Sequence, residues 1–317
     1  MLALMQKSVL FALFAAAAVG CGGGNQMDGG GDDSPPPTDA SVTPDSPPPP
    51  PGFTRLVGRT WTVPSGQQDV YRCVRVTIPQ DTYITNILAQ APLGTHHTVL
   101  SIASGSAAGA DGEQDCNAGT LGTVMLYASG VGTSPLDFPA DVGIKVAAGT
   151  QVHLNLHLYN ASDQTLSGDS AILVKAQSTP PPMLAEMVFA GTGNFQIPSG
   201  SQPYTKTTSC NVSSPYRLFA VWPHMHKLAT HQKVELIRGG TPTVLHDLAY
   251  NFTEQKYYLK APEVQVMQGD QIRVSCTWVN TTGSSVGFGE SSDKEMCFSG
   301  LYRYPAANAG LFSCIGL

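Results

Sequence analysis

The residues best suited to chemistry in this chain are histidines that occur in close pairs. The sharpest signal among the eight histidines is His224-Met225-His226. In a β-strand, residues i and i+2 point to the same face, so both imidazoles can converge on one metal ion. A hydrogen-bonded polar pair is the commoner role of this motif in a β protein. The motif alone leaves both interpretations open.

His96 and His97 form an adjacent pair, which a regular strand would split between its two faces. Both side chains can bind one ion only if the backbone bends at this point. Pro92-Leu93-Gly94, directly upstream, favours such a bend. Taken alone, two adjacent histidines more often lie on the surface by chance than form a metal site.

His153 and His157 have the same parity within the stretch Gln151–Tyr159, so either could reach a site on that face of a strand. The remaining histidines, His231 and His246, have no partner at metal-ligand spacing. We interpret these two as surface or structural residues.

Short runs rich in Val, Ile, Thr and Tyr, separated by turn residues, make up most of the chain after residue 52. Several of them alternate apolar with polar residues, as half-buried strands do. No stretch keeps a helical period over three turns. The clearest expected strands are Thr98–Ile102, Gly143–Val146, Gln151–Tyr159, Ala171–Ala176, Lys233–Ile237 and Gln271–Trp278.

This pattern predicts an all-β fold of two tandem antiparallel β-sandwich domains, jelly-roll-like in form. The proline-rich stretch Gln177–Pro182 is the best internal boundary. We expect an N-terminal domain over residues 53–178 and a C-terminal domain over residues 183–317, without a sequence repeat between them.

The first 20 residues have the features of an export signal. Lys7 supplies a positive charge, and the apolar run Val9–Val19 is too short to span a bilayer. The run ends in Ala18-Val19-Gly20-Cys21, which looks like a bacterial lipobox. We therefore expect a lipid anchor on Cys21 and a place in the bacterial envelope, on the periplasmic or surface face of the outer membrane. Secretion with a free Cys21 is the alternative.

Residues 21–52 predict a solvated linker, because residues 22–51 hold nine prolines and five aspartates and no Lys or Arg. Much of the net charge of −6 lies there. The remainder is nearly neutral, which argues against nucleic acid or anionic lipid as a partner.

Six cysteines follow Cys21, at positions 73, 116, 210, 276, 297 and 314. An even number in an exported chain predicts three disulfides. The positions alone leave all pairings open.

The segment Gly289–Cys297, with Glu295-Met296-Cys297 after a Gly/Ser turn, resembles the methionine-ligand segment of the copper type II, ascorbate-dependent monooxygenases. These are the peptidylglycine and dopamine hydroxylases. Tyr250–Pro262 and Gln268–Cys276 are similar to the same family's C-terminal domain. The resemblance covers residues 55–317, and all six ligand positions occur in family order.

Carried over residue by residue, the resemblance implies two coppers per chain. His96, His97 and His157 would hold the electron-transfer copper, with His157 favoured over His153 by the Tyr-Asn that follows it. The oxygen-binding copper would be held by His224, His226 and Met296, which are then the catalytic residues. Imidazole serves both oxidation states of copper, and a thioether biases a site toward Cu(I).

In that family, ascorbate or a similar reductant supplies single electrons, dioxygen binds at the methionine site, and a substrate C–H bond is hydroxylated. The two coppers lie apart across a solvent-filled cleft. The resemblance also implies the disulfides Cys73–Cys116, Cys210–Cys314 and Cys276–Cys297.

Two departures bear on the substrate. Trp222 stands where the peptidylglycine enzymes place a carboxylate-binding arginine, and Gly300 stands where they place a tyrosine. We therefore expect a small apolar or aromatic substrate rather than a C-terminal glycine peptide. A Trp222 that only packs beneath the site is the alternative.

The sequence thus predicts an exported, lipid-anchored copper monooxygenase that acts as a monomer on a small molecule and dioxygen. One rival is a copper-binding lipoprotein that stores or delivers copper without turnover. A second rival is an adhesive β-sandwich with structural histidines, which the six matched ligand positions disfavour.

Overall fold

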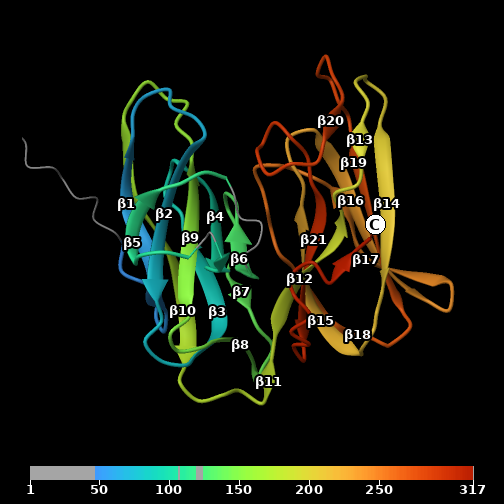
Figure 1. Ribbon diagram of the computed structural model, residues 1–317, viewed down its shortest axis with the longest axis horizontal. Coiled ribbons are helices and arrows are strands. Elements are labelled where there is room, and N and C mark those ends of the chain that lie inside the picture. Colours follow the sequence, from blue (N-terminus) through green and yellow to red (C-terminus); the bar gives the residue numbers. More distant parts are fainter. Residues whose placement is uncertain (1–46, 106–107, 119–123, 317) are drawn as a thin grey trace, which may run out of the picture. The chain divides into compact units, whose positions relative to one another are not determined.

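The computed structural model describes residues 47–105, 108–118 and 124–316. The expected export signal, Cys21 and nearly all of the linker lie outside these residues. The described chain consists of strands, turns and loops without a helix, which confirms the all-β fold class (Figure 1). Within it there is accordingly no helix able to cross a membrane. Residues 43–317 form one compact unit, so their division into two domains stays a prediction.

The N-terminal half of this unit contains ten strands in two main sheets. One sheet has the order β1-β10-β3-β8-β11, with β7 paired to β3, and the other has the order β5-β2-β9-β4-β6. The strands are β1 (Thr54–Val63), β2 (Val70–Thr77), β3 (Thr82–Gln90), β4 (Thr95–Ile102), β5 (Gly112–Asp115), β6 (Val124–Ser129), β7 (Leu136–Asp137), β8 (Val142–Val146), β9 (Gln151–Leu158) and β10 (Leu166–Gln177).

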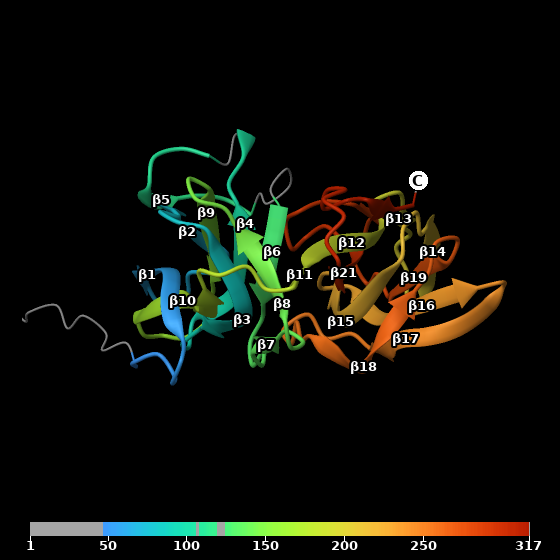
Figure 2. The ribbon, with the colours of Figure 1, turned by 90° about the horizontal axis from the view of Figure 1, so that it is seen from below.

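The C-terminal half has two larger sheets, of order β18-β15-β21-β12-β22 and β14-β19-β16-β17, and a short pair β13-β20 (Figure 2). Its strands are β11 (Met183–Leu184), which pairs with β8, β12 (Glu186–Thr192), β13 (Gln196–Ile197), β14 (Tyr204–Asn211), β15 (Tyr216–His224), β16 (Ala229–Arg238), β17 (Thr241–Ala249), β18 (Tyr258–Val266), β19 (Gln271–Trp278), β20 (Val286–Gly287), β21 (Cys297–Tyr304) and β22 (Cys314–Ile315).

Strand burial follows from side-chain alternation. In β19 every second residue is buried, and these residues pack with those of β12 and β15 into one apolar core. In β9 both faces are buried. Leu154, Leu156 and Leu158 belong to a second apolar core. Asn155 and His157, on the other face of β9, line a cavity.

The second core cluster continues from the N-terminal half into the C-terminal half, where it includes Phe219 and Tyr302. Hydrogen bonds cross the same boundary. The Tyr302 hydroxyl donates to the backbone oxygen of Leu126 at 3.1 Å. The Tyr257 hydroxyl accepts from the backbone N–H of Ala128 at 2.9 Å and donates to the same residue's carbonyl. These contacts fix the inner sheets of the two halves against each other.

Three disulfides are present, in the pairs that the resemblance implies: Cys73–Cys116, Cys210–Cys314 and Cys276–Cys297. The first joins β2 to the residue after β5, and the second joins β14 to β22. The third joins β19 to β21 at the residue beside Met296. Each such bridge typically stabilises a fold by about 2–4 kcal/mol.

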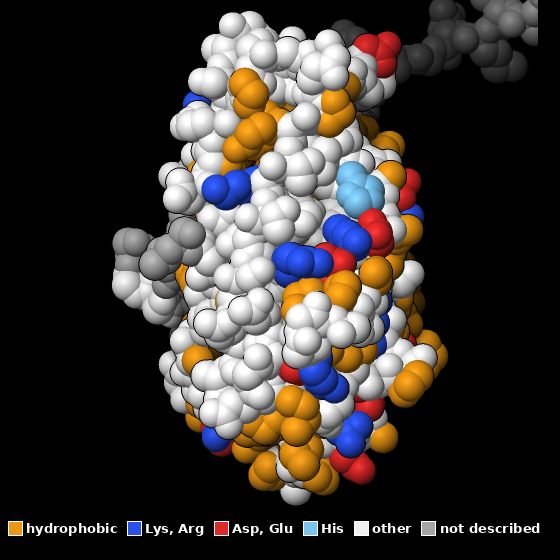
Figure 3. Space-filling view, turned by 90° about the vertical axis from the view of Figure 1, so that its right-hand side faces the viewer, with side chains coloured by type: hydrophobic (Ala, Val, Ile, Leu, Met, Phe, Trp, Pro, Cys, Tyr) orange, Lys and Arg blue, Asp and Glu red, His pale blue; other side chains and the backbone are white. Residues whose placement is uncertain are grey.

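The face seen in Figure 3 carries basic and acidic side chains next to one another. On the sheet that contains β16, β17 and β19 these charges form ion pairs. Glu235 bonds to Lys233 and Arg273, and Asp247 bonds to His231 and Lys233. This arrangement gives a mixed surface rather than a field of one sign.

Candidate metal centre

A bulge in β4 explains how the adjacent residues His96 and His97 can both face one site. In the pairing with β9, Thr95 lies opposite Leu158 and His97 lies opposite His157, so His96 is an extra residue. A bulge of this kind changes the direction of the side chains around it. Both imidazoles can therefore approach His157 on the neighbouring strand.

The turn before the bulge explains why the bend occurs where it does. The N–H of Thr95 donates to the carbonyl of Pro92 at 2.9 Å. Gly94 has a φ of +99°, and a Cβ at this position would lie 2.6 Å from the ring of Trp61. Both the backbone angle and the close approach require glycine here.

Three ring nitrogens of this group face one another. The Nδ1 atoms of His96 and His157 each lie 3.3 Å from the Nδ1 of His97. Two donors bound to one ion tetrahedrally, at metal–nitrogen bonds of about 2.0–2.1 Å, would be about 3.3 Å apart. Within the described residues, these histidines are the one cluster of three potential ligands from His, Cys, Asp and Glu. We call them the three-histidine set.

Other side chains fix the orientation of His157. Its Nε2 lies 2.8 Å from Asp69 Oδ1, and its ring stacks on Tyr71 with centroids 4.6 Å apart. An imidazole that donates its Nε2–H to a carboxylate keeps its Nδ1 lone pair for a metal. No local sequence pattern indicates this role for Asp69, because the contact spans 88 positions.

The imidazoles of the three-histidine set are held neutral. Burial, and after it the nearby His157, lower the pKa of His96 to about 4. Burial also lowers the pKa of His97 well below its ordinary value, and that of His157 in spite of the Asp69 carboxylate. Neutral imidazole is the form that binds metals, so the set is ready to bind at neutral pH.

The second histidine pair lies at the end of a strand rather than within one. β15 ends at His224, and His226 follows outside the sheet, which corrects the expectation of a continuous strand. The reason is a side chain that replaces the sheet partner. The hydroxyl of Tyr250 accepts from the N–H of Met225 at 3.0 Å and donates to its carbonyl at 2.7 Å.

In both histidines of this pair the Nδ1 atom has a hydrogen-bond partner, which leaves the Nε2 atom for a metal. His226 Nδ1 lies 2.9 Å from the carbonyl oxygen of Lys294, and His224 Nδ1 lies 3.1 Å from Gln255 Oε1. The two rings are 5.4 Å apart and nearly perpendicular. Burial lowers the pKa of His224 to about 3 and that of His226 to about 4, so both are neutral at pH 7.

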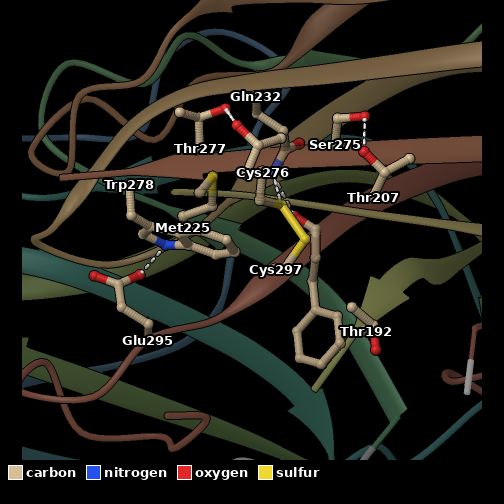
Figure 4. Close-up of a disulfide and its surroundings, with 12 residues drawn as sticks. Thr192, Thr207, Met225, Gln232, Ser275, Cys276, Thr277, Trp278, Glu295 and Cys297 are labelled. Carbon is tan, nitrogen blue, oxygen red and sulfur yellow. Dashed lines mark hydrogen bonds between the residues drawn. A yellow bond between two sulfur atoms is a disulfide. The ribbon is translucent and has the colours of Figure 1, made fainter. Parts of the chain in front are cut away.

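Met296 lines the same cavity as His224 and His226 and is 6% exposed. We call these three residues the methionine set. The carboxylate of Glu295, next to Met296, accepts from the backbone N–H of His226 at 3.0 Å. It also accepts from Trp278 Nε1 at 2.8 Å (Figure 4). One buried side chain thus links the two ligand segments, and burial raises its pKa.

Both sets meet at one cavity. It is lined by His97 and His157 from the three-histidine set and by all three members of the methionine set. The buried side chain of Gln255 contacts one histidine of each set. Further lining side chains are mostly aromatic or apolar and include Tyr71, Met125, Phe189, Trp222, Phe252, Phe298, Leu311 and Phe312.

The other histidines lie apart from the cavity. His153 is buried on β9, four residues before His157, and its ring nitrogens have no hydrogen-bond partner among the described residues. His231 pairs with Asp247 at 2.9 Å on the surface. His246 is buried against Tyr258, with ring centroids 4.5 Å apart.

Residues 183–315 match the family described as copper type II ascorbate-dependent monooxygenase, C-terminal domain. Over these residues the chain is similar to the C-terminal domain of that monooxygenase family. The chain is also 24% identical over 246 residues, 70% of its length, to the human putative DBH-like monooxygenase protein 2. It spans about half of that relative, since the match covers 49% of the relative's length.

Similarity to solved structures is weak. The major capsid protein P2 of bacteriophage PM2 is 12% identical, with a TM-score of 0.32 over 82% of this chain and 100% of that one. An allantoicase is 10% identical, with a TM-score of 0.24 over 78% of this chain and 81% of that one.

The donor atoms fit the metal of the monooxygenase family. Imidazole nitrogen binds both oxidation states of copper, and thioether sulfur selects Cu(I). The three-histidine set offers nitrogen alone, whereas the methionine set adds the sulfur of Met296. The two sets therefore differ in their donor chemistry.

Proposed function

We propose that the chain is a copper-dependent monooxygenase that hydroxylates a C–H bond of a small organic substrate, using dioxygen and an ascorbate-like reductant. The observation that carries this proposal is the meeting of two chemically different ligand sets at one cavity. Bound copper would supply one-electron transfer at the three-histidine set and reaction with dioxygen at the methionine set.

The chain's own residues hold these ligands ready. Asp69 accepts the Nε2–H of His157 and keeps that nitrogen from competing for the metal. Glu295 fixes the backbone at His226 beside Met296, and the Cys276–Cys297 disulfide anchors the following residue to β19. A ligand set held in this way loses little freedom when the metal binds.

The cavity supports a neutral, apolar or aromatic substrate. Its described lining contains no Lys or Arg, and residues 106–107 and 119–123, which lie outside the description, contain none in the sequence. Lys227 is not part of the described lining, and its Nζ lies 6.0 Å from the centre of the Phe252 ring. A substrate carboxylate would therefore lose its hydration without gaining a partner, which is costly.

Trp222 contributes to this preference in two ways. Its ring is 1% exposed, lines the cavity and stacks on His224 with centroids 4.9 Å apart. A Cβ on Gly300 would lie 3.1 Å from Trp222 Cε3, so the indole occupies space beside that glycine. Trp222 thus both packs against a ligand and forms a cavity wall.

Oxygen consumption tests the proposal. Copper-loaded protein with ascorbate and a panel of neutral aromatic and aliphatic compounds should consume oxygen faster than free copper does. The hydroxylated product should contain one atom from ¹⁸O-labelled dioxygen. If fully loaded protein exceeds free copper with no member of the panel, the chain is instead a copper carrier.

For its setting, we propose export, a lipid anchor at Cys21 and a monomeric state. The support is the lipobox-like sequence before Cys21 and the acidic, proline-rich stretch after it. On the face seen in Figure 3 the charges are mixed and form no basic field that would attract nucleic acid. Mass spectrometry of the mature N-terminus would reveal a lipid on Cys21 or its absence.

A further inference from the structure

The side-chain amide of Gln255 contacts both ligand sets. Its Nε2 lies 2.6 Å from His97 Nε2, and its Oε1 lies 3.1 Å from His224 Nδ1. Gln255 is 2% exposed and belongs to the loop between β17 and β18. It is a small polar bridge within an otherwise mainly apolar cavity.

The backbone around Gln255 is held in place by the N-terminal half. The hydroxyl of Thr133 donates to the Gln255 carbonyl at 2.9 Å. A Cβ on Gly130 would lie 2.9 Å from the Gln255 backbone nitrogen, which shows how closely the two segments pack. The N–H of Val131 donates to the carbonyl of Thr253 at 3.2 Å. The amide therefore has little room to retreat from the two histidines.

Metal binding would set the protons that face this amide. His97 presents Nδ1 to the other members of its set and Nε2 to Gln255. His224 presents Nδ1 to Gln255. A neutral imidazole that binds a metal through one nitrogen carries its proton on the other. With copper on Nδ1 of His97 and on Nε2 of His224, both nitrogens that face Gln255 become N–H donors.

One amide cannot satisfy two such donors in this position. Its oxygen and its NH₂ group point to different histidines, and only the oxygen accepts a hydrogen bond. Turning the amide over moves the conflict from His97 to His224 without removing it. An N–H group that faces another N–H donor at this distance is destabilised, and a buried donor without an acceptor is costly.

We propose that Gln255 couples the two copper sites negatively. Filling one set leaves both histidine contacts of the amide satisfied, whereas filling both sets leaves one histidine N–H facing the NH₂ group without an acceptor. This inference rests on the proposed function only in requiring that both sets bind copper. Couplings between sites are typically about 5- to 150-fold, and the same factor applies whichever site fills first.

Copper titration under anaerobic conditions tests this coupling without substrate or turnover. The Cu(I) affinity of the methionine set is measured by competition with a chelator in the wild type, where the three-histidine set is full. It is measured again in His96→Ala, where that set is empty and His97 is free to accept from Gln255. The affinity should be at least about fivefold tighter in His96→Ala.

The matched variant is Gln255→Glu, which has the same shape but two acceptor oxygens. The same comparison made in this background should give a ratio near one, because the carboxylate accepts from both histidines. The negative charge that Gln255→Glu introduces attracts copper to the methionine set both with and without His96. This effect therefore cancels from the ratio of the two Cu(I) affinities. Gln255→Met, which removes the opposing NH₂ group, should also bring the ratio near one and serves if the charged variant misfolds.

Three results would overturn the coupling. They are a ratio near one in the wild type, a wild-type ratio that both Gln255 variants leave unchanged, and a chain that binds only one copper in every variant. The readout is separate from catalysis. Coupled copper binding without oxygen consumption would refute the monooxygenase and leave the role of Gln255 standing.

Discussion

At the scale of single residues, the sulfur of Met296 is what separates the two ligand sets. Met296→His keeps three donors in the methionine set but exchanges a soft sulfur for a harder nitrogen, which favours Cu(II). We expect this variant to retain copper and to lose most of its ascorbate-driven oxygen consumption. Met187→Leu, which changes a buried methionine that does not line the cavity, should keep both. Unchanged oxygen consumption in Met296→His would exclude Met296 from the oxygen site.

Asp69 allows an equally specific test of the three-histidine set. Asp69→Ala removes the acceptor for His157 Nε2–H, and losing such an outer partner typically costs about 10- to 100-fold in metal affinity. Copper at this set should weaken by that factor, as measured by chelator competition, while the methionine set keeps its affinity. Asp141→Ala is the matched control, since Asp141 has a similar φ of 63° against 56° for Asp69. Equal effects of the two changes would assign the loss to the backbone instead.

The types and spacing of the ligands could be predicted from the sequence, but their supporting contacts could not. The bend at His96-His97 follows from the glycine and proline just before it. Asp69, Gln255 and Glu295 act through side-chain contacts with residues 31 to 158 positions away. No local sequence pattern indicates such partners, because segments far apart in the sequence bring them together when they pack.

At the scale of elements, the strand that follows Met296 depends on its disulfide. Cys276→Ser frees β21 from β19 beside the ligand, so we expect weaker copper at the methionine set and undisturbed copper at the three-histidine set. Cys210→Ser is the control, because it opens the bridge between β14 and β22. Both changes should destabilise the fold by about 2–4 kcal/mol, as measured by chemical denaturation. A similar copper loss in both would point to general loosening rather than local anchoring.

The contact between β17 and β18 should make stability depend on pH. Burial lowers the pKa of His246 to about 4, so as pH falls the unfolded chain takes up a proton at about 6.5 while the folded chain does not. The free energy of unfolding contributed by this group is thus fully present above pH 6.5 and is lost toward pH 4. His246→Phe, which preserves an aromatic ring in contact with Tyr258, should flatten this part of the pH profile. An unchanged slope in denaturation between pH 4 and 6.5 would contradict the buried, neutral state of His246.

The strands themselves were well predicted where one face is buried. The expected strand Gln271–Trp278 matches β19, whose burial alternates, and Gln151–Tyr159 exceeds β9 by one residue. The end of β15 was not predicted. The parity of His224 and His226 suggested a strand through both, but the hydroxyl of Tyr250 takes the hydrogen bonds that a neighbouring strand would otherwise provide.

At the scale of the compact unit, the cavity exists because the two halves pack through a shared core. β9 could be predicted as a strand, but its second buried face reflects residues of β12, β15 and β21 that cover that side. Alternation within one strand does not reveal what covers its outer face. For this reason the two ligand sets could be predicted from the resemblance. Their common cavity and the contacts of Gln255 with both sets are visible only in the structure.

The central claim is that one chain holds two chemically different copper centres, and X-ray absorption at the copper edge tests it most directly. Protein loaded with copper and reduced without oxygen should contain two coppers per chain, one of them with a sulfur neighbour. Met296→Leu should remove the sulfur signal and leave the nitrogen neighbours. A wild-type spectrum without sulfur, or a sulfur signal that survives Met296→Leu, would contradict the assignment of the methionine set.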